Sequence, residues 1–91
     1  MVNVRVPTIL RSYTSGAAEI GCEPGTLREV IASLEAAYPG IGGRLLDADG
    51  KLRRFVNVYV NEEDVRLAGG LDADVAEGAH VSIIPAVAGG A

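Results

Sequence analysis

The chain's strongest pattern is Thr26-Leu27-Arg28-Glu29-Val30-Ile31-Ala32-Ser33-Leu34-Glu35-Ala36-Ala37-Tyr38. Thr26 followed by Glu29 is typical of a capping box, in which a hydroxyl and a carboxylate reciprocally satisfy first-turn N–H donors. Apolar side chains then share one face at helical spacing: Leu27, Val30, Ile31, Leu34 and Tyr38. Pro24-Gly25 and Pro39-Gly40 bound the segment. The pattern predicts one amphipathic helix that must cover an apolar surface.

Two strands are predicted before this helix. Val2, Val4 and Val6 alternate with polar residues, which is typical of a half-buried strand, and Pro7 ends it because proline lacks a ladder donor. After a polar connection, Ala18–Cys22 alternates again and favours a hairpin return.

The chain after the helix predicts shorter elements. We expect a helical turn at Ile41–Leu46, a reversal at Asp47–Gly50 and the longest strand at Leu52–Val60. The remaining expectations are a turn at 61–64, an edge segment at 65–67, a helical turn at 71–75 and a final strand at 80–85.

This order of elements indicates an α+β fold, a ubiquitin-like β-grasp. We expect a mixed sheet of four to five strands with one main helix on one face and the first and last strands parallel neighbours. Residues 1–85 would form this domain, and residues 86–91 would protrude from it as a flexible tail containing Gly89-Gly90.

Composition narrows the function classes. Ninety-one residues with 48% hydrophobic content fit one domain, and a net charge of −4 argues against nucleic-acid binding and fits a basic protein partner. The single cysteine, Cys22, excludes an internal disulfide and favours a cytoplasmic location. No apolar run approaches membrane-spanning length, so we expect no membrane partner.

The C-terminal tail is the main candidate functional segment. Its residues are small and uncharged: Ala86, Val87, Ala88, Gly89 and Gly90. Extended, these five residues span at most roughly 17 Å. So narrow a backbone suits entry into a confined pocket of another protein, where Val87 would be the one sizeable anchor.

Other residues carry weaker signals. Phe55 and Tyr59 share a strand face and form either a docking surface or part of the core. Cys22 is expected as a small, partly buried hydrophobe, and His80 lacks partners for a catalytic triad or a metal site. The acidic residues are expected in solvated turns, and no metal site is predicted from them: Glu62, Glu63, Asp64, Asp72, Asp74 and Glu77.

Several separated segments together resemble the ThiS/MoaD family of ubiquitin-like sulfur-carrier proteins, especially the actinobacterial cysteine-biosynthesis carriers. They are Pro7–Arg11, Leu34–Tyr38, Arg54–Asn61, Glu63–Arg66 and Ile84–Gly90. The resemblance implies a protein co-substrate that is not itself an enzyme and binds no cofactor. An E1-like enzyme would use ATP to adenylate Gly90, which would then become a thiocarboxylate.

The resemblance also implies partners. A sulfur-accepting synthase, of the pyridoxal-phosphate-dependent cysteine synthase type or a thiosugar synthase, would take the sulfur, and a metallopeptidase would trim or release the chain. Ala91 follows Gly90 and departs from the family pattern, so we expect processing between Gly90 and Ala91. The alternatives are a molybdopterin synthase small-subunit role and a ubiquitin-like interaction or modifier module.

Overall fold

A computed structural model describes residues 1–54 and 56–85. Its elements, with 3-10 helices written η, are β1 (Val2–Arg5), η1 (Thr8–Thr14), β2 (Glu19–Cys22), β3 (Gly25–Thr26), α1 (Leu27–Ala37), α2 (Gly42–Leu45), β4 (Val56–Val60), β5 (Glu63–Asp64), η2 (Val65–Leu67), η3 (Gly70–Asp72), β6 (Asp74–Val75) and β7 (His80–Pro85). The final strand has the bounds that the sequence predicts.

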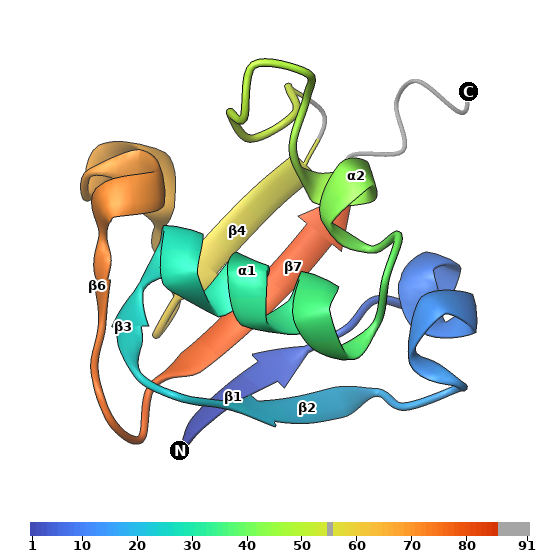
Figure 1. The fold of residues 1–91 in the computed structure, drawn as a ribbon. Helices are drawn as coiled ribbons and strands as arrows, with labels where there is room; N and C mark the ends of the chain where they lie inside the picture. The colour runs from blue at the N-terminus through green and yellow to red at the C-terminus, as the bar shows by residue number, and fades with distance from the viewer. Residues whose placement is uncertain (55, 86–91) are drawn as a thin grey trace.

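The main sheet has five strands in the order β2-β1-β7-β4-β5. β1 and β2 form an antiparallel hairpin, and β1 lies parallel to β7 with Val4 opposite Val81. β7 is therefore a central strand, antiparallel on its other side to β4. Figure 1 shows α1 crossing one face of this sheet. The predicted mixed β-grasp sheet, with its first and last strands parallel, is confirmed.

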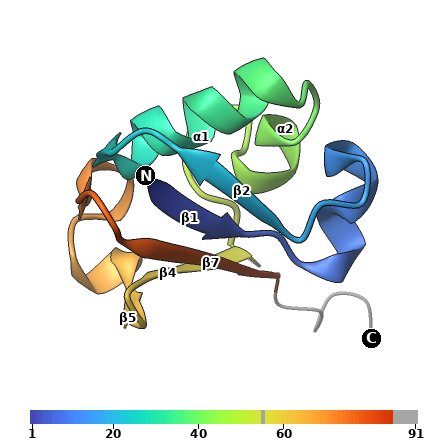
Figure 2. The same ribbon diagram turned by 90° about the horizontal axis from the view of Figure 1, so that it is seen from below.

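Helix α1 begins where the capping box predicts. The Thr26 main-chain N–H donates to Glu29 Oε1 at 2.9 Å, and the Glu29 N–H donates to Thr26 Oγ1 at 3.3 Å. Leu27, Val30, Ile31 and Leu34 are buried against the sheet, whereas Tyr38 is the C-cap residue and only partly buried. The other face of the sheet has no helix over it in the part of the chain that the structure describes (Figure 2).

We expect Thr26→Ala to lower the free energy of unfolding by about 1 kcal/mol, because it leaves a first-turn donor without its partner. Urea denaturation of the two proteins measures the difference. Thr26→Ser retains the hydroxyl and is the control. Equal stability of the alanine variant and the unmodified chain would contradict the role of the cap.

The predicted strand Leu52–Val60 is too long. Leu52 makes only an isolated bridge to Leu46, and the Arg53 N–H donates to the carbonyl of Leu45 at 2.9 Å. These bonds hold residues 52 and 53 against α2, so β4 begins only at Val56. The longest strand among the described residues is consequently β7, with six residues.

The region after β4 also differs from the prediction. Asn61 and Glu62 reverse the chain with φ values of 51° and 72°, and the edge strand is Glu63–Asp64, inside the predicted turn. Val65–Leu67, predicted as the edge segment, is the 3-10 helix η2 because Val65 turns inward and is fully buried.

The prediction of one helical turn over residues 71–75 is partly wrong. The turn is η3 (Gly70–Asp72), and Asp74–Val75 forms β6, which pairs with β3 in a separate two-stranded sheet. Strands of two residues are too short to show alternation in a sequence. This small sheet fixes the entry to α1, since the Leu27 N–H donates to the carbonyl of Ala73 at 2.9 Å.

Candidate functional site

The candidate site is the end of β7, where the predicted tail begins. We call Ile83–Pro85 the tail root. Ile83 is buried in the core, and Ile84 is 48% exposed on the opposite face. Pairs of Pro85 with Val56 and of Ile84 with Asn57 hold the root to β4. Thus the chain is held in a central strand up to Pro85. The predicted tail, Ala86–Gly90, and the predicted processing site at Gly90 and Ala91 lie outside the described residues.

Arg66 supports the strand that holds the tail root. Its guanidinium donates to the carbonyls of Arg53 at 2.9 Å and Val56 at 2.7 Å, and to Asn57 Oδ1 at 2.8 Å. Charge-assisted bonds of this kind fix geometry as well as adding energy. The sequence pattern predicts Arg66 in an edge segment and does not reveal this role, because main-chain acceptors leave no mark in a sequence pattern.

The sequence also does not reveal a hollow beside the tail root, which we call the tail-root groove. Its volume is about 260 Å³, and its lining residues come from η1, α2, β4 and β7: Ile9, Leu10, Ser12, Tyr13, Arg44, Val56 and Ile83. Figure 1 shows η1 and α2 at the end of the sheet where β7 ends. The groove is largely apolar with one cation at its rim.

Arg44 is held in place at that rim. Its Nε donates to Tyr13 Oη at 2.7 Å, and its Cζ lies 5.8 Å from the centre of the Tyr13 ring. Such a cation near an aromatic ring is also attracted by the ring quadrupole. The two contacts orient the guanidinium, and among the described residues no group accepts a hydrogen bond from its terminal nitrogens.

Tyr59 lies on the open face of the sheet, the face opposite α1. It is half-buried there and pairs with Ser82. Phe55, its partner in the predicted docking surface, lies outside the described residues. The docking role of Phe55 and Tyr59 therefore stays a prediction.

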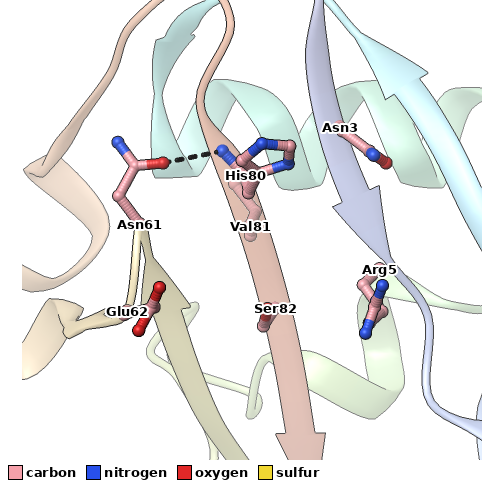
Figure 3. Close-up of a pocket in the computed structure, with 7 residues that line it drawn as sticks. All are labelled: Asn3, Arg5, Asn61, Glu62, His80, Val81 and Ser82. Carbon is pink, nitrogen blue, oxygen red and sulfur yellow. Dashed lines mark hydrogen bonds between the residues drawn. The ribbon is translucent and has the colours of Figure 1, made fainter.

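His80 also lies on the open face, at the start of β7. It borders a polar hollow of about 270 Å³ with Asn3, Arg5, Asn61, Glu62, Val81 and Ser82 (Figure 3). The main-chain N–H of His80 donates to Asn61 Oδ1 at 3.0 Å. Within the described ranges the imidazole makes no hydrogen bond or ion pair, so no nucleophile, base and orienting group converge there.

Cys22 is buried more completely than the partial burial that the sequence predicts, and it is a free cysteine. Burial raises the pKa of its thiol, because desolvation disfavours the thiolate. The folded chain therefore binds the thiol proton more tightly than the unfolded chain. Stability from this group is present below the ordinary thiol pKa and is lost as the pH rises through the folded-state value.

We expect Cys22 to react with iodoacetamide on the order of 100-fold more slowly in the folded chain than in urea at about pH 8, because the folded thiol is both shielded and less ionised. Quenched samples analysed by mass spectrometry give both rates. Free cysteine in the same buffers controls for the effect of urea on the reagent. Equal rates in the two states would show that the thiol is accessible.

Three of the acidic residues contact basic groups or a main-chain N–H of the same domain. Asp72 pairs with Arg28 at 3.0 Å, Glu77 pairs with the N-terminal amine, and Asp64 Oδ1 accepts from the Arg66 N–H at 2.9 Å. Over residues 1–54 and 56–85, no group of three or more His, Cys, Asp or Glu side chains is placed to hold a metal ion. No helix in these ranges is long and apolar enough to cross a membrane.

Comparison with known proteins agrees with the β-grasp fold. Residues 4–90 match the ThiS family. The chain is 54% identical to the sulfur carrier protein CysO of Mycobacterium tuberculosis over 91 residues, covering 98% of each chain.

Solved structures agree with these sequence matches. The crystal structure of M. tuberculosis CysO superposes with a TM-score of 0.91 at 52% identity, covering 96% of this chain and 100% of that one. An Amycolatopsis orientalis BexX/CysO complex contains a chain that matches with a TM-score of 0.93 at 46% identity, covering 97% of this chain and 98% of that one. The chain therefore belongs to the ThiS family, and its similarity to CysO supports a sulfur-carrier role.

Proposed function

We propose that this chain carries sulfur as a thiocarboxylate on Gly90, after removal of Ala91. A glycine carboxylate is a poor electrophile and must first be activated. On an E1-like enzyme, the Gly90 carboxylate attacks the α-phosphorus of ATP, pyrophosphate leaves, and an acyl-adenylate forms. Sulfide then adds to the carbonyl carbon and AMP leaves. The product is a thiocarboxylate whose sulfur is a nucleophile.

The observation that best supports this proposal is the position of the tail root. β7 is paired with β1 over its first half and with β4 up to Pro85, so the point of departure is fixed in the centre of the sheet. Five further residues to Gly90 span at most roughly 17 Å. A fixed root followed by small residues suits delivery of one reactive atom into a partner's pocket.

The proposal assigns the catalysis to partner enzymes. The E1-like enzyme would bind the ATP, and a sulfur-accepting synthase would supply the electrophile. We favour a pyridoxal-phosphate-dependent cysteine synthase type, with a thiosugar synthase as the other class. A metallopeptidase would remove Ala91 or release the sulfur-bearing product. The chain itself would bind no cofactor and would act in the cytoplasm.

A second candidate is a subunit role, in which the chain stays bound to one enzyme and completes its active site, as in molybdopterin synthase. The BexX/CysO complex is the observation that favours this second candidate, because a relative at 46% identity crystallises in a complex with another protein. A carrier exchanges between enzymes during turnover, whereas a subunit does not. Pulse-chase labelling of the bound chain distinguishes the two.

The direct test is reconstitution. A chain ending at Gly90 is incubated with ATP, sulfide and the candidate activating enzyme, and its intact mass is measured. We expect the mass increase of one oxygen-to-sulfur exchange, located on Gly90 by fragmentation, and no change without ATP. Failure to gain sulfur with an activating enzyme that is active on another carrier would contradict the proposal.

A further inference from the structure

We infer that the tail-root groove is a docking site for the proteins that take the tail, and that it receives an aliphatic side chain flanked by a carboxylate. This inference rests on the proposed function, since it concerns partners that accommodate Gly90. It adds a second recognition element, made by the folded domain, to the tail itself.

The short length of the tail limits how far from this groove a partner can bind. A partner that surrounds Gly90 has its surface within roughly 17 Å of Pro85, because the intervening residues reach no further. Val56, which pairs with Pro85, and Ile83 both line the groove. The rim of a pocket that takes up the tail therefore lies within reach of the groove.

The lining favours an apolar group. Leu10, Val56 and Ile83 are buried and form its inner part, while Ile9 is 62% exposed at its edge. An exposed isoleucine beside a hollow gains stability when a partner's apolar side chain covers it. An aliphatic side chain fits both the apolar lining and the volume of about 260 Å³.

Arg44 adds the requirement for a carboxylate. Its Nε is used by Tyr13, but among the described residues no carboxylate lies within ion-pair distance of its guanidinium. An oriented guanidinium can bind a carboxylate through two parallel hydrogen bonds and loses little freedom in doing so.

The charges around the groove are mixed. Arg11 and Arg53 lie at the same end of the molecule, where they donate to the carbonyls of Val6 and Gly43. Acidic Glu62 and Glu77 lie near the opposite end of the sheet, by the start of β7 and the N-terminus. Acidic side chains also lie near the end that holds the groove, since Glu35 accepts from the Gly42 N–H at 2.7 Å and Asp47 follows α2 closely. The attraction for a partner carboxylate therefore comes from the oriented Arg44 guanidinium and not from the net charge of this surface.

BexX of A. orientalis is the probe for this inference, because its complex contains a relative of this chain. Calorimetry compares chains ending at Gly90. We expect Arg44→Glu to weaken BexX binding on the order of tenfold or more, through loss of the carboxylate pair and repulsion of that carboxylate. Ile9→Ala should weaken it several-fold. Arg28→Glu, on α1 away from the groove, is the matched charge control and should stay within about twofold.

Two further measurements make the test decisive. Melting temperatures confirm that each variant folds, and amide NMR shifts of the unmodified chain on adding BexX should change at Ile9, Tyr13 and Arg44. Unchanged affinity of Arg44→Glu, shift changes confined to the open face, or no binding of BexX would each overturn the inference. So would NMR shifts at the groove caused by deleting residues 86–91 without BexX, which would identify the chain's own tail as the occupant.

The outcome is separable from that of the proposed function. Sulfur gain on Gly90 is read by mass with the activating enzyme, whereas docking is read by BexX affinity without ATP or sulfide. Weakened docking of Arg44→Glu together with no sulfur gain by the chain ending at Gly90 without substitutions would contradict the carrier chemistry alone. Normal sulfur gain with unaltered docking would contradict the groove alone.

Discussion

A chain that ends at Ala91 is expected to gain sulfur at least about 100-fold more slowly than the same chain trimmed to Gly90, because one extra residue moves the carboxylate about 3.5 Å and adds a methyl group beside it. The trimmed and untrimmed proteins are incubated separately with the activating enzyme, ATP and sulfide. Intact mass against time gives both rates.

Two controls separate the length of the tail from the nature of its last residue. Deleting Ala88 from the untrimmed chain gives a tail as long as that of the trimmed chain but retains the terminal alanine. Gly90→Ala in the trimmed chain keeps the length and adds only the methyl group. Equal sulfur gain by the untrimmed and trimmed chains would contradict the need for processing at Gly90 and Ala91.

The largest stability effect is expected for Leu34→Ala, which should lower the free energy of unfolding by about 2–5 kcal/mol. Leu34 is 1% exposed and lies where α1 packs on the sheet, among Val4, Val58 and Val81. Its removal loses apolar burial and leaves a cavity that this small domain cannot easily fill. Urea denaturation measured by circular dichroism gives the value.

The neighbouring residue provides the control for this variant. Ser33 is exposed on the same helix, and Ser33→Ala should change stability by less than about 0.5 kcal/mol. A loss below about 1 kcal/mol for Leu34→Ala would show that the helix is not packed on the sheet as described.

Much of the fold could be predicted because its main elements have strong local signals. Thr26 and Glu29 mark the start of α1, and Val2 with Val4 alternates clearly enough to mark β1. The parallel pairing of β1 with β7 followed from the order of the elements. The errors lie where tertiary contacts decide, as at Arg53, whose bonds to α2 delay the start of β4.

Part of the candidate site could be predicted from the sequence, and part could not. The tail could be singled out because its small residues follow a strand directly in sequence. The groove could not, since Ile9, Arg44 and Ile83 are far apart in the chain and meet only through packing. Arg66 was missed for a related reason, because it bonds to main-chain carbonyls, which any residue supplies.

The most direct test of the carrier proposal is the intact mass of the protein isolated from the cells that make it. We expect a chain ending at Gly90, part of it carrying one sulfur in place of a C-terminal oxygen, and conversion of that part to the carboxylate when an acceptor enzyme and its substrate are added. Recovery of only the chain ending at Ala91, without sulfur under any growth condition in which the activating enzyme is present, would contradict the proposal.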